Sequence, residues 1–217
     1  MHQTRGITRR LFLALGAIVF AGASVVVSPA RAEPVAPDQM IEKLSTEVLE
    51  TIKSDPAYQN GNFDKVSSLV DSSIMPHVNF ERMTALAVGR GWRSASPEQR
   101  ESLIREFRVL LLRTYAGALT QVRDDQRIEV KPLRGKPEDE AIVRTQVVGS
   151  GEPIQLSYRL ERNGDSWRIF DLNVLGVWLI DTYRNQFKQI VNAQGVDGLI
   201  QTLAEKNEQF AKAAGRG

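Results

Sequence analysis

The sequence predicts an α+β domain in which helices cover one face of a strongly curved antiparallel sheet of about four strands. Two observations carry this prediction. Apolar residues recur every three or four positions up to about residue 122 and again after residue 176, which is typical of amphipathic helices. Between residues 127 and 174 apolar residues alternate with polar ones and the connections are short, which is typical of antiparallel strands.

Four helices are expected before the sheet. The apolar spacing predicts the first over residues 38–54, the second over 64–73 and the third from Phe80 to the stop at Gly89. The segment Ser96-Pro97-Glu98-Gln99 is a capping box with proline at the first helical position, so it predicts the start of a fourth helix. We expect that helix to reach about Val122.

The sheet is expected to consist of short strands joined by tight turns. Alternating apolar residues mark four of them: Ile128–Val130, Val143–Val147, Ile154–Leu160 and Trp167–Val174. Asn163-Gly164 predicts the hairpin turn between the last two, because both residues tolerate positive φ. After Gly176 the helical spacing returns, first over residues 177–191 and then from Asp197 into a polar tail.

The first 32 residues have the three parts of a secretory signal peptide. They contain four arginines and no acidic residue, then an uncharged stretch at Leu11–Val27, then the small-residue cleavage pattern Ala30-Arg31-Ala32. The alternative is a membrane anchor, although 17 residues is at the lower limit for spanning a bilayer. Thr8-Arg9-Arg10-Leu11-Phe12-Leu13 is similar to a twin-arginine export signal. We therefore predict export to the periplasm.

Cleavage after Ala32 would change the charge of the chain. All 217 residues together carry 28 Lys and Arg against 26 Asp and Glu, a net charge of +2. Residues 33–217, which we predict to form a single α+β domain, carry 24 basic and 26 acidic side chains and a net charge of −2. The basic balance therefore belongs to the signal peptide, and no nucleic-acid partner is expected.

The chemistry of an enzyme is mostly missing from the sequence. The chain has no cysteine, which excludes thiol catalysis and zinc–thiolate sites, and His77 is the single histidine after residue 32. No G-x-S-x-G, P-loop or H-E-x-x-H motif occurs. Asp171 with Tyr158 or Tyr183 could serve acid–base catalysis in a cone-shaped sheet, as in some steroid isomerases. We predict no catalytic residue, no metal ligand and no cofactor, and favour a non-enzymatic function.

Three segments of the chain resemble the MlaC family, the periplasmic phospholipid-binding proteins of lipid-asymmetry maintenance, also called toluene-tolerance proteins. The resemblance runs in order from about Asp38 to Asn207. A hopanoid-associated branch of the family keeps much of the same pattern. The matching segments are Met75–Thr84 leading to Gly91-Trp92-Arg93, Ser96–Arg100 through Arg113-Thr114-Tyr115-Ala116, and Ser166–Asp171 with Gly176-Val177 and Tyr183-Arg184, ending at Gly195–Leu199.

The resemblance implies an NTF2-like fold and a carrier that holds phospholipid acyl chains in an apolar cavity. Such a carrier shuttles lipid between inner- and outer-membrane complexes and maintains outer-membrane lipid asymmetry. The implied partners are an inner-membrane ABC transporter complex with an MCE-domain subunit and an outer-membrane lipoprotein–porin complex, and we expect a monomer. The alternatives are a hopanoid or other lipid carrier of the same family, a non-enzymatic periplasmic assembly factor, and an NTF2-like enzyme.

The resemblance also leads to a set of candidate site residues. The expected lipid-binding wall is Leu110, Leu111, Tyr115, Leu156, Tyr158, Val174, Val177 and Tyr183. The expected pocket mouth, with arginines near the lipid phosphate, is Trp92, Arg93, Trp178 and Arg184. A filled core and a lined pocket use the same residue types, so both interpretations stay open. The family usually has Asp at Asn79 and a small polar residue at Trp178.

Overall fold

Side-chain caps define where the helices before the sheet begin. Asp55 accepts a hydrogen bond from the amide of Ala57, and Asn62 accepts one from Lys65. Asn79 and Ser96 cap the next two major helices in the same way, and the predicted capping box of Ser96 and Gln99 is confirmed. Each cap satisfies an amide that has no partner inside its helix. These local bonds explain why the sequence predicted the helix starts well.

The computed structural model describes residues 35–133, 135 and 137–214. The predicted signal peptide and its cleavage site lie outside the described residues. None of the described helices is both long and apolar enough to cross a membrane. The helices that precede the sheet are α1 (Pro37–Ser54), α2 (Pro56–Gln59), α3 (Phe63–Leu69), the π-helix η1 (Val70–Ile74), the 3₁₀-helix η2 (Met75–His77), α4 (Phe80–Val88), α5 (Arg90–Ser94) and α6 (Pro97–Leu119).

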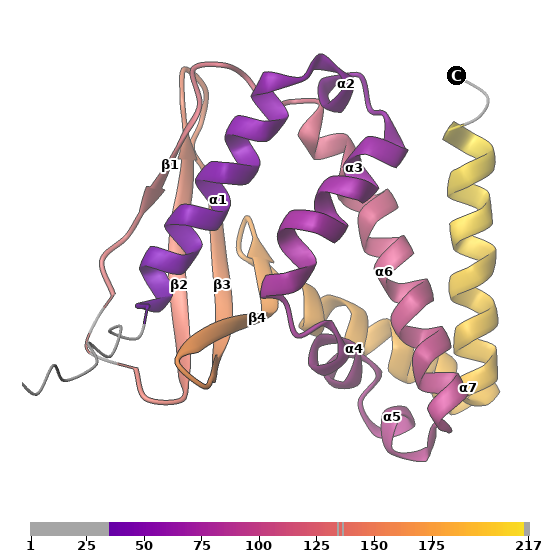
Figure 1. Ribbon diagram of the computed structural model, residues 1–217. Coiled ribbons are helices and arrows are strands. Elements are labelled where there is room, and N and C mark those ends of the chain that lie inside the picture. The colour runs from indigo at the N-terminus through magenta and orange to yellow at the C-terminus, as the bar shows by residue number, and fades with distance from the viewer. Residues whose placement is uncertain (1–34, 134, 136, 215–217) are drawn as a thin grey trace, which may run out of the picture. The chain divides into compact units, whose positions relative to one another are not determined.

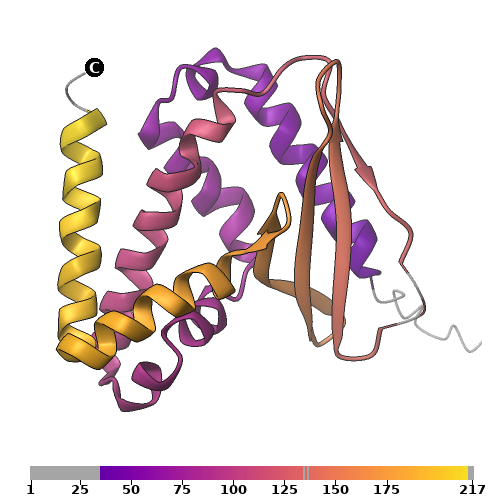
Figure 2. The ribbon, with the colours of Figure 1, turned by 180° about the vertical axis from the view of Figure 1, so that it is seen from behind.

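An antiparallel sheet follows, with its strands in chain order from one edge to the other. Helix α1 crosses one face of this sheet (Figure 1). The chain ends in α7 (Leu179–Ala214), which is broken at Gly195, where φ is 71°. The second half of α7 runs beside α6 (Figures 1 and 2). The strands are β1 (Arg127–Val130), β2 (Glu140–Val148), β3 (Ile154–Asn163), β4 (Ser166–Val174) and β5 (Val177–Trp178).

The structure confirms the α+β class and refines the predicted elements. The described sheet has five strands rather than about four, because Val177 and Trp178 pair with β4 instead of starting the last helix. The second predicted helix is α3 followed by a π-helical turn, and α6 ends at Leu119 rather than Val122. Gly89 ends α4 as predicted. Its φ of 65° turns the chain directly into the short helix α5, which no sequence pattern predicted.

The described part of the chain has two hydrophobic clusters rather than one continuous core. The helical cluster is built by α4, α6 and α7 around Phe107, which is fully buried and contacts the ring of Tyr183 at 5.0 Å. The sheet cluster joins one face of α1 to β2, β3 and β4. Val78 packs against both clusters. Several apolar side chains of the sheet and of α6, among them Leu156, Val174 and Tyr115, are only partly buried.

Candidate functional site

Several predicted wall residues lie on one face of the sheet. Leu156 is directly opposite Val174 in the β3–β4 ladder, and Val174 is opposite Val177 in the β4–β5 ladder. Paired residues of antiparallel strands project to the same face, and so do residues two positions apart, which adds Tyr158. This is also the face that α1 covers, since Leu160 and Val143 of the same alternation belong to the sheet cluster. The structure thus brings these four predicted residues together.

The predicted wall residues of the helices fall into two groups. Leu110 is only 3% exposed and Tyr183 only 7%, and both belong to the helical cluster. Leu111 and Tyr115, which are one helical turn apart, are half-buried. Burial still raises the pKa of the Tyr115 hydroxyl above its usual value. Leu110 and Tyr183 are therefore packed core residues, whereas Leu111 and Tyr115 keep surface that a ligand could cover.

Exposure divides the sheet residues in the same way. Leu156, Tyr158 and Val174 are half-buried, and Val177 is 56% exposed. The pattern is that of an apolar face covered by α1 at one end and left open toward β5 at the other. Sequence alternation identified the face correctly, but it could not tell which positions α1 would cover.

A hydroxyl group interrupts this apolar face beside α1. The hydroxyl oxygen of Tyr158 lies 3.4 Å from that of Ser45, and burial is the main cause that raises the pKa of Tyr158. Thr145, opposite Leu156 on β2, has a buried hydroxyl with no hydrogen-bond partner among the described residues. Tyr158 is therefore neutral, and this cluster carries no charge toward the apolar face.

The four predicted mouth residues are not one group. Trp92 and Arg93 lie on α5, and the guanidinium of Arg100, which belongs to α6, lies 5.3 Å from the centre of the Trp92 ring. A Cβ atom at Gly91 would lie 3.0 Å from Val191 of α7. Since Trp178 directly precedes α7, the helical rise separates it from Val191 by roughly 18 Å along the axis. The two tryptophans therefore lie at different ends of the first half of α7.

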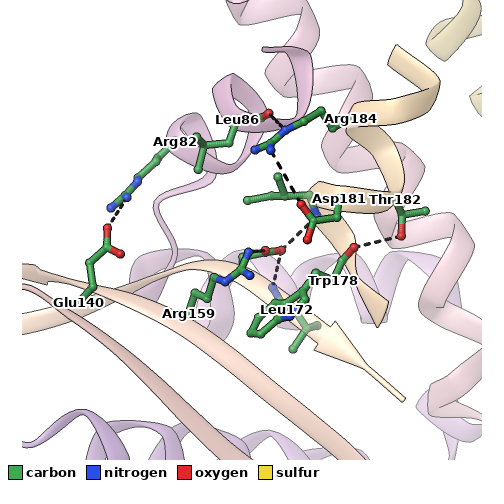
Figure 3. Close-up of polar contacts among 11 residues, drawn as sticks. Arg82, Leu86, Glu140, Arg159, Leu172, Trp178, Asp181, Thr182 and Arg184 are labelled. Carbon is green, nitrogen blue, oxygen red and sulfur yellow. Dashed lines mark hydrogen bonds and ion pairs between the residues drawn. The ribbon is translucent and has the colours of Figure 1, made fainter. Parts of the chain in front are cut away.

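Trp178 and Arg184 belong to a polar network on the opposite face of the sheet from Leu156. Trp178 pairs with Asn173, and the Arg159 guanidinium stacks 3.9 Å from the Trp178 ring centre. Arg184 donates to the carbonyl of Leu86 at 3.0 Å and lies 3.9 Å from the carboxylate of Asp181. Figure 3 shows these contacts between β3, α4 and the start of α7. Trp178 therefore links β5 to β3, and Arg184 links α7 to α4.

Asp171 anchors the start of α7, a role that the sequence analysis did not assign. Its fully buried carboxylate accepts hydrogen bonds from the amides of Leu172 at 2.9 Å and Ile180 at 3.1 Å. Arg159 donates to its second oxygen at 2.8 Å. Burial is the main cause that raises the pKa of Asp171, and the two amides and Arg159 oppose it. Asp171 therefore positions β5 and α7 relative to the sheet.

The same register argues against an acid–base site at Asp171. Asp171 is paired with Arg159, whereas Tyr158 is paired with Leu172, so the carboxylate and the phenol project to opposite faces of the sheet. Tyr183, the other candidate partner, packs against Phe107 in the helical cluster. Within the described ranges no three His, Cys, Asp or Glu side chains are grouped so that they could hold a metal ion.

Asn79 links α4 to the sheet in a way that an aspartate could not. Its side-chain oxygen accepts from the amide of Arg82 at 3.0 Å, and its amide nitrogen donates to Glu161 at 2.6 Å. Arg82 also forms an ion pair with Glu161. A second ion pair joins Arg82 to Glu140 at 2.5 Å, and Figure 3 shows it. An aspartate would keep the helix cap but would place two carboxylates in contact. Asn79, which stands where the family usually has Asp, thus has a hydrogen-bond acceptor in Glu161 that an aspartate would repel.

We predict that Asn79→Asp lowers the free energy of unfolding by about 1 kcal/mol at pH 7. The new carboxyl group would contact that of Glu161, and one of the two would have a pKa above its unfolded value, so the folded state binds the extra proton more tightly. The loss of stability should therefore be absent near pH 4 and grow as the pH rises toward 7. Urea unfolding of both proteins at several pH values measures it.

The double variant Asn79→Asp/Glu161→Gln is the matched control for this prediction. The amide of the introduced glutamine can donate to the introduced carboxylate, so the pH-dependent part of the loss should disappear. A loss of equal size at pH 4 and pH 7 in the single variant would contradict the carboxylate contact.

Comparison with known proteins bears on this arrangement. The sequence profile of the MlaC protein family matches residues 42–205. The intermembrane phospholipid transport system binding protein MlaC of Haemophilus influenzae is 27% identical over 163 residues, covering 73% of this chain and 72% of the relative. Toluene tolerance protein ttg2D of Pseudomonas putida is 25% identical over 179 residues, covering 82% of each chain.

A solved structure is similar over most of the described fold. The phospholipid-binding protein from Ralstonia solanacearum, determined in complex with a phospholipid, has a TM-score of 0.78 and 41% sequence identity to this chain. The match covers 82% of this chain and 99% of the Ralstonia chain. The chain belongs to the MlaC family.

Proposed function

We propose that this protein binds a phospholipid whose acyl chains lie between the sheet and helix α6. The observation that carries the proposal is a set of half-buried apolar side chains at the edges of the two hydrophobic clusters, on the sheet and on α6. On the sheet side these are Leu156, Tyr158 and Val174, and on α6 they are Leu111 and Tyr115. The phospholipid complex of the Ralstonia relative supports the same class of ligand.

The physical need for such a carrier is large. Each buried CH₂ group contributes about 0.8 kcal/mol, so two long acyl chains exposed to water cost roughly 20–25 kcal/mol. A protein that covers the tails and leaves the headgroup hydrated removes most of this cost. It needs no nucleophile, metal or cofactor, which fits a binding face made of Leu, Val and Tyr side chains. Among the expected wall residues, Leu110 and Tyr183 support the site from behind, because they lie in the helical cluster.

The remaining assignments concern where the headgroup lies. Val177 is the most exposed of the expected wall residues, so the open end of the site is at β5. Trp178 and Arg184 lie beyond this end on the opposite face of the sheet, and Trp92 and Arg93 lie at the far end of the first half of α7. We propose that only the groups near β5 are close enough to influence the lipid headgroup.

The cellular role follows from the family and from the predicted signal peptide. We propose that the chain is exported, cleaved after Ala32, and acts as a single-domain monomer in the periplasm. There it would exchange lipid with an inner-membrane ABC transporter complex containing an MCE-domain subunit and with an outer-membrane lipoprotein–porin complex. The name of the Haemophilus relative, an intermembrane phospholipid transport system binding protein, supports this role.

Native mass spectrometry of the purified mature protein tests the proposal. We expect one lipid adduct per chain, and its mass and fragmentation identify the lipid class. A hopanoid adduct would assign the chain to the other branch of the family. A protein that stays empty after incubation with phospholipid vesicles would contradict the carrier function and favour an assembly factor.

A further inference from the structure

The turn between β4 and β5 contains a leucine in an unfavourable backbone conformation. The loop is the pair Leu175-Gly176, because Val174 and Val177 are the last paired residues. Leu175 has φ 50° and Gly176 has φ 92°, and Leu175 is the one non-glycine with positive φ among the described residues. Two-residue turns with positive φ at both positions favour Asn-Gly, since a leucine side chain is strained there.

The turn holds its strained residue in a fixed position. The amide of Leu175 donates to the carbonyl of Gln155 at 3.1 Å, and the amide of Gly176 donates to the side chain of Asn173 at 2.9 Å. Leu175 is nevertheless 66% exposed, the highest value among the large apolar residues described, and Val177 follows at 56%. Leu175 thus combines an unfavourable backbone conformation with an apolar side chain exposed to water. Such a combination is typical of a functional site.

The exposed apolar side chains at this turn continue the proposed acyl-chain site. Val177 projects to the same face as Val174 and Leu156, and Ile154, two residues before Leu156, is 37% exposed. In both ribbon views the β4–β5 hairpin rises between the long strands and helix α6 (Figures 1 and 2). This is the interval in which the proposed function places the ligand.

From these observations we infer that the β4–β5 turn is an apolar lip of the lipid site, on which Leu175 covers part of a bound acyl chain. The inference rests on the proposed function and adds to it a residue that sets how long the lipid is held. The occupant is the hydrocarbon of the bound lipid rather than a bilayer, because the exposed residues continue the face of Leu156. Lipid binding then offsets the exposure of Leu175.

The substitution Leu175→Asn separates this role from a structural one. Asparagine suits the positive φ and removes exposed apolar surface, so the melting temperature should stay equal or rise by about 2–4 °C. Lipid release should become roughly tenfold faster, because the acyl chain loses its leucine contact. Leu175→Met, which keeps an apolar side chain, should release lipid at the wild-type rate.

The measurement is release of a pre-loaded fluorescent phospholipid into excess methyl-β-cyclodextrin, a soluble acceptor, followed by stopped-flow fluorescence. Ile142→Asn is the matched control, since Ile142 is 41% exposed but lies on the other face of the same sheet. Faster release from Leu175→Asn alone would support the inference. Equal release rates for wild type and Leu175→Asn would overturn the inference. This holds even if Leu175→Asn takes up lipid from vesicles at a different rate. A wild-type protein that loads no lipid would instead overturn the proposed function itself, and the lip with it.

Discussion

Replacing Leu156 with arginine is expected to weaken phospholipid binding at least about a hundredfold. Leu156 lies in the middle of the half-buried face, paired with Val174 on one side and Thr145 on the other. An unpaired guanidinium held against hydrocarbon costs about 3 kcal/mol or more, and each 1.4 kcal/mol corresponds to a tenfold change in affinity. Lipid recovered with the purified protein, measured by native mass spectrometry, should fall, and titration with a fluorescent phospholipid measures the change in affinity.

Gln155→Arg is the control for Leu156→Arg. Gln155 is the preceding residue of β3, is exposed, and projects to the other face. It introduces the same charge into the same strand and should leave lipid recovery unchanged. Val174→Arg, opposite Leu156, should behave like Leu156→Arg. If Leu156→Arg and Val174→Arg fold normally, as judged by circular dichroism, and carry as much lipid as wild type, the proposed site is misplaced.

Replacing Asp171 with alanine is expected to lower the free energy of unfolding by about 3 kcal/mol. The substitution removes the acceptor for the Leu172 and Ile180 amides and leaves Arg159 without its carboxylate partner. Because these bonds join the sheet to α7, the loss should also loosen the β4–β5 hairpin. Urea unfolding measures the stability, and hydrogen exchange of the residue 177–183 amides measures the local effect.

Asp171→Asn separates the hydrogen bonds of Asp171 from its charge. Its carbonyl oxygen can still accept from the Leu172 and Ile180 amides, so the loss should be smaller than in Asp171→Ala. Burial raises the folded-state pKa of Asp171 above the usual 3.8, so its ionisation opposes folding as the pH rises from 3.8 through the folded-state pKa. The asparagine variant lacks this pH dependence. An alanine variant as stable as wild type would contradict the anchoring role of Asp171.

Local hydrogen bonds explain how much of the fold the sequence predicted. The caps at Asn79 and Ser96 and the stop at Gly89 depend on residues within one turn, so their positions follow from the local sequence. Alternation over β3 likewise identified which residues share a face, whereas the register shift opposite Arg159 and Leu160 breaks the alternation of β4. The short helix α5 and the two-residue strand β5 were missed, since five- and two-residue segments carry no measurable periodicity. Strand β5 exists only because its backbone pairs with β4.

Local sequence patterns do not predict which apolar side chains of the candidate site are buried. Leu110 and Leu111 are neighbours on α6 with the same side chain, yet Leu110 is in the helical cluster and Leu111 is half-buried. Their difference depends on how α4 and α7 pack around α6, which no local pattern records. Arg159 and Asp171 are twelve residues apart and meet only because β3 and β4 are paired in one register.

The sequence by itself determined the α+β class, the helix starts, the apolar face of the sheet and the resemblance to the MlaC family, because these depend on short-range spacing and on residue identity. Only the tertiary structure decided that the apolar residues form two clusters, that Leu156 and Val174 are half-buried, and that a strained, exposed Leu175 stands in the β4–β5 turn. Burial depends on which distant segments cover a side chain. That is a property of the packed chain and not of any stretch of it.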